Sequence, residues 1–165
     1  MINNLHILED PRQLITPFSP RIYNLAWSLG SAEEAFYFVR DTIKYVRDPN
    51  EVWRTAERTL DLGVGDCDDQ AILLCSLFRA LGEPSKVLII ELPMGGHATV
   101  ELRPGEIRDP TIKHMRFDQN VEYFNARLIA DFNEAELNIY DELTYRSIIV
   151  AQPTFYGALE KPDLG

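Results

Sequence analysis

The most regular hydrophobic pattern in the chain lies in DCDDQAILLCSLFRALG, residues 66–82. Its apolar residues follow one another at steps of three and four, the spacing of one face of an α-helix. Further apolar residues widen that face, and Gly82 stands where such a helix ends. The pattern therefore predicts a helix that is buried on most of its sides.

A second helix is predicted over residues 31–46. Ser31 and Glu34 stand three positions apart, as the two residues of a capping box do. Apolar residues then recur at helical spacing until Asp48 and Pro49, where we expect the helix to have ended.

The remaining N-terminal segments carry weaker patterns. Residues 19–30 predict a short helix that Gly30 ends, and residues 50–63 predict a loop or a short turn of helix. Residues 1–20 contain three prolines and predict an irregular arm, with a short strand at 5–8.

The chain beyond residue 82 has patterns typical of strands. Residues 85–92 predict one strand, and residues 97–111 predict a hairpin about Pro104–Gly105. Residues 121–132 predict another strand, and residues 136–151 predict a helix and a strand. A buried helix followed by antiparallel strands indicates the α+β class.

Composition narrows the possible partners. The chain has 165 residues, and 16 Lys and Arg against 26 Asp and Glu leave a formal charge of −10. That charge disfavours nucleic acid and membrane surfaces as partners. The length suits a single domain over residues 1–165, with the N-terminal arm and a C-terminal tail from residue 152.

The sequence also predicts a cytoplasmic setting. It has no apolar run near the roughly 20 residues that span a bilayer. Its N-terminus lacks the basic start and apolar stretch of a signal peptide. A reducing environment follows, whether the source is cellular or viral. The composition leaves the oligomeric state open.

The two cysteines need separate explanations. Cys67 and Cys75 lie in the same predicted helix, roughly 12 Å apart along its axis at about 1.5 Å per residue. A disulfide needs Cα atoms within about 7 Å, so the two cannot pair, and they cannot share one zinc ion. Cys75 has apolar neighbours and is predicted to be a core residue.

Cys67 stands in the first turn of this helix, within GVGDCDDQA. Unpaired N–H groups and the helix dipole favour an anion there, although three aspartates oppose a thiolate. Asp66 can act as the N-cap. Asp68 and Asp69 fall about 100° and 200° around the helix from Cys67, so they can point away from the sulfur.

A base and an orienting carboxylate follow in the hairpin. His97 stands behind two glycines at the start of one strand, and Asp109 lies on the return strand. A thiol, a histidine and a carboxylate form the arrangement of an activated nucleophile, because the base takes the thiol proton and the third group fixes the base's tautomer.

These residues resemble the transglutaminase-like cysteine enzymes, which have a papain-related fold. The resemblance is carried by TLDLGVGDCDDQAILLCSLFRALGEPSKVLII, then GGHATVEL, then IRDPT, and it runs from about residue 32 to 112. It implies that Cys67 is the nucleophile, His97 the general base and acid, and Asp109 the orienting carboxylate. EVWRTAERTL resembles the segment before the family's nucleophile, which implies a part for Trp53, beside Asp66 and the Cys67 N–H, in the oxyanion or substrate site.

The resemblance implies thiol-dependent acyl transfer on amide bonds without a cofactor. The expected substrate is a protein or peptide, and the expected reaction is hydrolysis of a peptide, isopeptide or side-chain amide. Transamidation to an amine is the alternative, and a non-catalytic interaction module is another. A zinc site formed by Cys67, His97 and Asp109 is a hypothesis of a different class. The three aspartates near Cys67 lack the ligand spacing of a calcium loop, so helix-start electrostatics is the preferred interpretation.

The triad places a demand on the hairpin. A two-residue turn at Pro104–Gly105 would pair Val100 with Asp109 and put His97 and Asp109 on opposite faces. If the triad exists, the hairpin must contain a bulge or an odd-length loop. We therefore expect Asp109 to lie opposite His97, Thr99 or Glu101.

Overall fold

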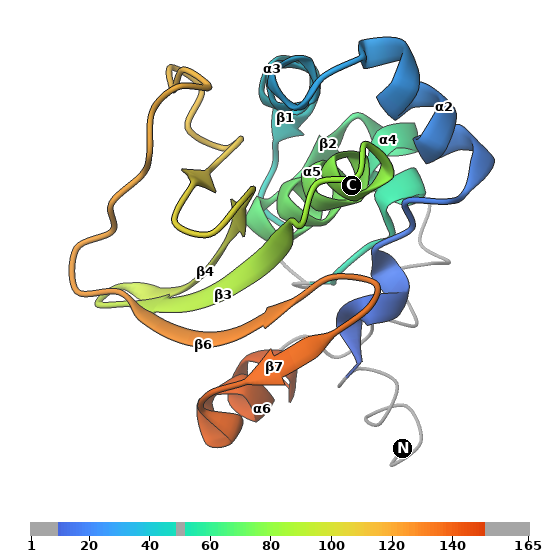
Figure 1. The fold of residues 1–165 in the computed structure, drawn as a ribbon. Coiled ribbons are helices and arrows are strands. Elements are labelled where there is room, and N and C mark those ends of the chain that lie inside the picture. The colour runs from blue at the N-terminus through green and yellow to red at the C-terminus, as the bar shows by residue number, and fades with distance from the viewer. Residues whose placement is uncertain (1–9, 49–51, 151–165) are drawn as a thin grey trace.

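The computed structural model describes residues 10–48 and 52–150 (Figure 1). The strand predicted at residues 5–8 and the tail from residue 152 lie outside the described residues. In chain order the elements are η1 (Pro11–Leu14), α2 (Pro20–Leu29), α3 (Ala32–Thr42), β1 (Lys44–Tyr45), α4 (Ala56–Leu62), β2 (Val64–Gly65), α5 (Cys67–Ala80), β3 (Lys86–Leu92), β4 (Gly95–Glu101), β5 (Ile107–Arg108), β6 (Arg127–Phe132), β7 (Leu137–Ile139) and α6 (Glu142–Val150).

A five-stranded antiparallel sheet in the order β5–β4–β3–β6–β7 forms one layer of the molecule. α5 packs against β4 and β3, and α2, α3 and α4 pack around α5 (Figure 1). α6 lies against β6. The predicted α+β fold, with a buried helix on an antiparallel sheet, is confirmed.

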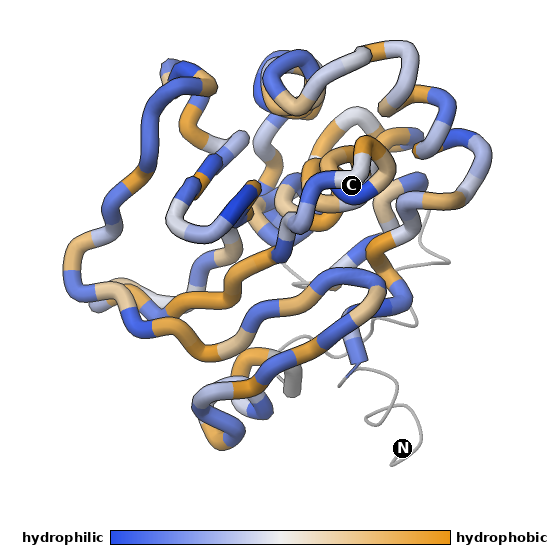
Figure 2. Tube along the Cα trace, viewed as in Figure 1, coloured by the Kyte–Doolittle hydropathy of each residue, from blue (hydrophilic) through white to orange (hydrophobic). Residues whose placement is uncertain are grey.

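α5 forms the centre of the hydrophobic core. Every residue from Asp69 to Phe78 is buried, including Cys75, as predicted. Apolar residues concentrate along α5 and β3 (Figure 2). Full burial of a leucine or phenylalanine side chain contributes about 1.5–3 kcal/mol. The core therefore holds α5 firmly, and with it the residue at its N-terminus.

The predicted helices are present, with one boundary wrong. α2 ends at Gly30, which has a left-handed φ of 89°, and Ser31 caps α3 by accepting from the Glu34 N–H. α3 stops at Thr42, however, instead of continuing to residue 46. The chain beyond it is extended because Lys44–Tyr45 pair in parallel with Val64–Gly65.

The structure also specifies two segments for which the sequence patterns were weak. Residues 50–63 contain α4, which Thr55 caps and Gly63 ends. In residues 136–151 the strand β7 comes before the helix α6. Asp141 accepts a hydrogen bond from the Thr144 N–H at 3.0 Å, which is the interaction of an N-cap and explains why a helix begins there.

The hairpin between β4 and β5 has an odd-length loop. Glu101 pairs with Ile107 and Val100 with Arg108, which leaves the five residues 102–106 between the strands. Gly105 takes a left-handed φ of 84° within this loop. Continued by one residue, the register sets Thr99 opposite Asp109. The expected register is therefore confirmed, and His97 and Asp109 share one face of the sheet.

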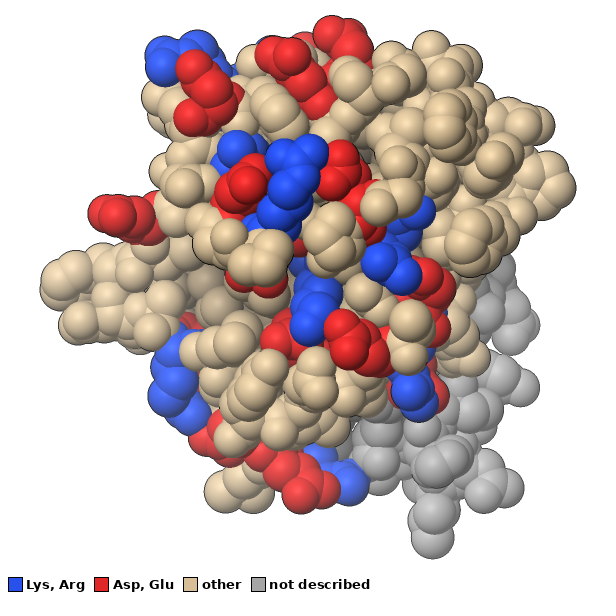
Figure 3. All heavy atoms as spheres, viewed as in Figure 1, with Lys and Arg blue, Asp and Glu red and all other residues tan. Residues whose placement is uncertain are grey.

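Surface charges are mixed rather than separated on the face in Figure 3, where Lys and Arg side chains stand beside Asp and Glu. Arg103 contacts both Glu83 and Glu106. Among the described helices, none combines the length and the apolar character that a membrane crossing requires.

Candidate active site

The turn before Cys67 has a geometry that only glycine permits. A Cβ atom on Gly65 would lie 2.7 Å from the Asp69 Cβ. This close approach lets Asp66 and Asp69 form a reciprocal capping box, in which each carboxylate accepts the other's backbone N–H at 3.3 Å. Cys67 is thereby fixed as the first residue of α5.

Arg54 is buried beneath this turn and neutralises its acidic residues. The guanidinium contacts Asp69 Oδ2 and Asp48 Oδ2, each at 3.2 Å, and Arg54 and its two partners are at most 2% exposed. The Arg54 backbone N–H also donates to Asp69 Oδ1. Burial raises the pKa of Asp69 well above its usual range, and the charge of Arg54 opposes that shift. Asp69 therefore points into the fold, away from the sulfur.

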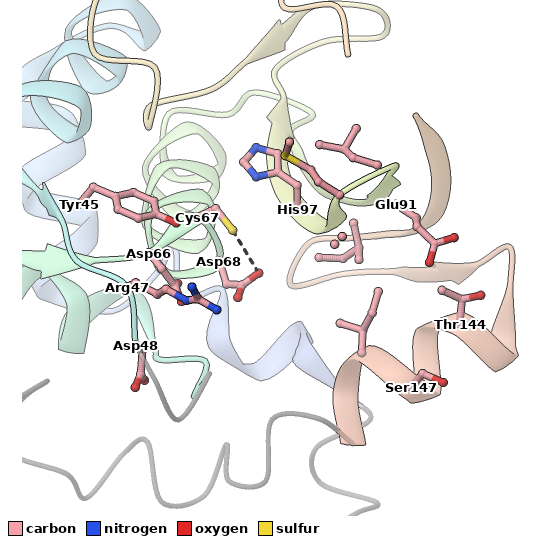
Figure 4. Close-up of a pocket in the computed structure, with 16 residues that line it drawn as sticks. Tyr45, Arg47, Asp48, Asp66, Cys67, Asp68, Glu91, His97, Thr144 and Ser147 are labelled. Carbon is pink, nitrogen blue, oxygen red and sulfur yellow. Dashed lines mark hydrogen bonds between the residues drawn. The ribbon is translucent and has the colours of Figure 1, made fainter. Parts of the chain in front are cut away.

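The Asp68 side chain, unlike that of Asp69, points toward the Cys67 sulfur. Its Oδ1 lies 3.9 Å from the Cys67 Sγ, so the side chain bends back to the thiol, which is a weak S–H donor (Figure 4). The expectation that the flanking aspartates point away from the sulfur holds for Asp69 and is wrong for Asp68. Burial, together with the charges of Asp68 and Asp66, raises the pKa of the Cys67 thiol, while a backbone hydrogen bond from Ala98 opposes the rise. These surroundings therefore favour the protonated thiol over the thiolate.

His97 and Asp109 are in direct contact. The His97 Nε2 lies 2.8 Å from Asp109 Oδ2. A carboxylate accepts only, so this contact assigns the ring proton to Nε2 and leaves the lone pair on Nδ1. The Asp109 side chain is 1% exposed and that of His97 is 19% exposed, so the ring reaches the surface and its partner does not.

Asp109 stays ionised in spite of its burial. Burial opposes the charged form, but hydrogen bonds from His97, Thr111 and Tyr123 outweigh it and hold the pKa of Asp109 below its ordinary value. Thr111 donates to Oδ1 through both its backbone N–H and its hydroxyl, at 2.9 and 2.6 Å. The result is a fixed negative charge behind the imidazole ring.

Cys67 and His97 line the same cleft, which has a volume of about 650 Å³. Ligand sites commonly measure about 300–1,000 Å³, so this cleft can hold part of a polypeptide. Figure 4 shows Cys67 at the start of α5 and His97 on β4, with Thr144 and Ser147 of α6 along a third side. The cleft is lined by more acidic than basic side chains, namely Asp48, Asp66, Asp68 and Glu91 against Arg47.

Sequence reasoning placed two further residues at the site. Asp66 does line the cleft. Trp53 does not, because its side chain is 1% exposed and its ring stacks on Phe132 at 6.3 Å within the core.

The structure also brings in residues that the sequence did not indicate. Tyr45 lines the cleft, and Tyr123 contacts Asp109. Tyr45 lay in a segment predicted to be helical, and Tyr123 lay in one predicted to be a strand, whereas β6 begins only at Arg127. No local signal marks either one.

The family is decided by a comparison of the sequence with family models. Residues 24–118, more than half of the chain, match the model of the transglutaminase-like superfamily. The chain belongs to the transglutaminase-like superfamily. The matched region includes Cys67, His97 and Asp109 and contains the whole of the resemblance at residues 32–112. Among curated proteins, none matches the chain.

Solved structures of other proteins show a similar fold at low sequence identity. A suspected cysteine protease from Cytophaga hutchinsonii has 19% identity and a TM-score of 0.52, over 66% of this chain and 42% of that protein. Calcium-bound LapG from Legionella pneumophila has 21% identity and a TM-score of 0.53, over 70% of this chain and 74% of LapG. A second LapG structure has 17% identity and a TM-score of 0.54, over 88% of this chain and 97% of LapG. The chain thus spans less than half of the Cytophaga protein and nearly all of LapG in the second structure.

Metal binding was the alternative of a different class. Within residues 10–48 and 52–150, no three His, Cys, Asp or Glu side chains converge in a way that could hold a metal ion. Asp109 gives one oxygen to His97, and Asp48 and Asp69 are both engaged by Arg54. These carboxylates already have protein partners of opposite charge or donor character.

Proposed function

We propose that this protein cleaves amide bonds of a protein or peptide substrate by acyl transfer through Cys67. The observation that carries the proposal is the His97–Asp109 contact, which in the neutral imidazole places the proton on Nε2 and the lone pair on Nδ1, at the cleft that Cys67 also lines. A thiol that shares a cleft with a histidine and its orienting carboxylate supports an activated nucleophile of this kind.

The raised pKa of the Cys67 thiol decides how the reaction begins. Because the sulfur rests in its protonated form, His97 Nδ1 takes the thiol proton as the sulfur attacks the amide carbonyl. The C–N bond then breaks, and the imidazolium gives this proton to the leaving amine. Water, deprotonated by His97, attacks the thioester, releases the acid and restores the thiol. Asp109 remains ionised throughout and stabilises the imidazolium.

The oxyanion formed by this attack needs hydrogen-bond donors. The Cys67 backbone N–H lies in the first turn of α5, where helix N–H groups have no intrahelical partner, and it is the first donor we assign. The second is the Tyr45 hydroxyl, which takes the part expected of Trp53. Tyr45 is set beside Gly65 by the β1–β2 pairing, and Figure 4 shows its hydroxyl on the Cys67 side of the cleft. Burial above all, and the nearby charge of Asp66, raise the pKa of Tyr45 to about 12, so the phenol keeps its proton.

Family membership and the fold support a thiol acyltransferase, and one of the similar structures is of a suspected cysteine protease. Transamidation is the second candidate. It is favoured by the acidic lining of the cleft, which attracts protonated amines. The two reactions share every step up to the thioester and differ in whether water or an amine resolves it.

The test follows acetylation of the protein by p-nitrophenyl acetate with intact-mass spectrometry. We expect one acetyl group on Cys67, none in Cys67→Ala, and acetylation about 10²- to 10⁴-fold slower in His97→Ala. Buried Cys75 is the internal control and should stay unmodified. Added glycine ethyl ester separates the candidates, because amide product marks transamidation and acetate marks hydrolysis. Equal rates for the wild type and His97→Ala, or acetylation of neither, would overturn the proposal.

A further inference from the structure

Tyr123 lies in the connection between β5 and β6 and reaches the buried side of the His97–Asp109 pair. Its hydroxyl is 2.5 Å from Asp109 Oδ2 and 2.9 Å from Thr99 Oγ1. Its ring lies against the His97 ring, with centroids 5.4 Å apart and planes inclined by 53°. A single side chain therefore contacts both the histidine and the carboxylate that holds it.

The contacts of Asp109 show what this hydroxyl contributes. A carboxylate has about four acceptor positions, two on each oxygen. Thr111 fills both positions on Oδ1, and His97 and Tyr123 fill those on Oδ2. With all four positions used, the carboxylate cannot rotate without losing a hydrogen bond. Its direction toward His97 Nε2 is therefore set from both sides.

The direction of the Tyr123 hydrogen bond follows from its single proton. The shorter contact is with a charged acceptor, so the proton lies toward Asp109. The Thr99 hydroxyl can then donate to the Tyr123 oxygen, since its other neighbour, the Arg108 carbonyl, is 3.4 Å away. Burial and the Asp109 charge raise the pKa of Tyr123, which keeps it a donor across the working pH range.

We propose that Tyr123 is a positioning residue, which fixes the tautomer and the ring orientation of His97 by holding the Asp109 carboxylate and packing against the imidazole. The catalytic consequence rests on the proposed function, whereas the effect on the His97 tautomer does not. The segment between β5 and β6 thereby becomes part of the site, although it lies outside the residues that carry the family motifs.

The test is Tyr123→Phe, which removes the hydroxyl and keeps the ring against His97. Nitrogen-15 NMR of the imidazole reports the tautomer in the free protein. We expect the wild type to hold the proton on Nε2, and Tyr123→Phe to show a mixture of the two tautomers. Acetylation of Cys67 should slow roughly 10- to 100-fold, since a hydrogen bond to a charged group is lost, with the concentration dependence on ester unchanged.

Tyr140→Phe is the matched control. Tyr140 donates to Asp131 Oδ2 at 2.7 Å, so it loses the same kind of hydrogen bond at a place that does not line the cleft. In Tyr140→Phe we expect the His97 tautomer and the rate of Cys67 acetylation to match those of the wild type. If Tyr123→Phe does not fold, Thr99→Val tests the same network from its other end and should shift the tautomer less but in the same direction.

The outcomes separate this proposal from the proposed function. A wild-type His97 tautomer in Tyr123→Phe, whether or not acetylation slows, would mean that the hydroxyl does not position His97, and the inference would fail. A tautomer shift in a protein whose wild type is never acetylated would support the positioning role and overturn the proposed function instead.

Discussion

Asp109 accepts from His97 Nε2 at 2.8 Å because the loop that joins their strands has five residues. A two-residue turn would have sent the two side chains to opposite faces of the sheet. Through this contact Asp109 selects the His97 tautomer that carries its proton on Nε2. Replacing it by Asn should slow Cys67 acetylation about 10²- to 10⁴-fold, because an amide does not select the same ring nitrogen as donor.

The matched control for that change is Asp131→Asn. Asp131 is also buried, accepts from Asn138 and Tyr140, and does not line the cleft. Acetylation rates by mass spectrometry should fall for Asp109→Asn alone. Equal rates in the two variants would remove Asp109 from the mechanism.

The contact between Asp68 and the Cys67 sulfur predicts that the Cys67 thiol reacts faster when the Asp68 charge is removed. The Asp68 charge raises the pKa of Cys67, so Asp68→Asn should lower that pKa. At neutral pH, below the pKa, the thiolate fraction rises about tenfold for each unit by which the pKa falls. The rate of iodoacetamide labelling against pH measures the shift. A profile that does not move toward lower pH would show that Asp68 does not act on the sulfur.

The buried position of Arg54 predicts a large loss of stability on its removal. Arg54→Met removes the buried guanidinium that pairs with Asp48 and Asp69, and breaking such a buried pair costs about 3–5 kcal/mol. Urea unfolding followed by circular dichroism measures the change. Arg103→Met is the control, because its pairs with Glu83 and Glu106 are exposed and contribute little. A similar midpoint for both variants would contradict the role assigned to Arg54.

The close approach at Gly65 predicts that alanine is not tolerated there. Its Cβ would meet the Asp69 Cβ at 2.7 Å, and relieving the overlap must displace the capping box and Cys67. Overpacking of this kind costs about 1–3 kcal/mol. Gly96→Ala is the comparison for unfolding, since its Cβ would meet Ile148 at an ordinary 3.7 Å. Thermal melts should show a lower Tm for Gly65→Ala only.

The assignment of Tyr45 as an oxyanion donor predicts that its loss slows one reaction of the Cys67 sulfur and spares another. Tyr45→Phe should slow acetylation by about 10²-fold, as the loss of one oxyanion donor does elsewhere. Labelling by iodoacetamide forms no oxyanion and should not slow comparably. If both reactions slow together, Tyr45 acts on the thiol and not on the oxyanion.

Much of the site follows from local patterns in the chain. The apolar periodicity of residues 66–82 and the acidic residues at its start determine a buried helix with Cys67 in its first turn. The order of the Cys, His and Asp motifs indicated the family, and the demand that His97 and Asp109 share a face predicted an odd-length hairpin loop. These inferences succeed because helix capping, periodicity and strand alternation depend on neighbours a few residues apart.

Only the tertiary structure decided which distant groups meet Cys67, His97 and Asp109. The pairing of Tyr45 with Gly65 ended α3 early and turned Tyr45 toward the cleft, while Trp53 entered the core. Arg54 meets Asp69 across 15 residues of sequence, and Tyr123 meets Asp109 across 14. Such contacts arise from the closure of loops and the packing of whole elements. Burial and hydrogen bonding at each place then select the partner, and neither is encoded in a local pattern.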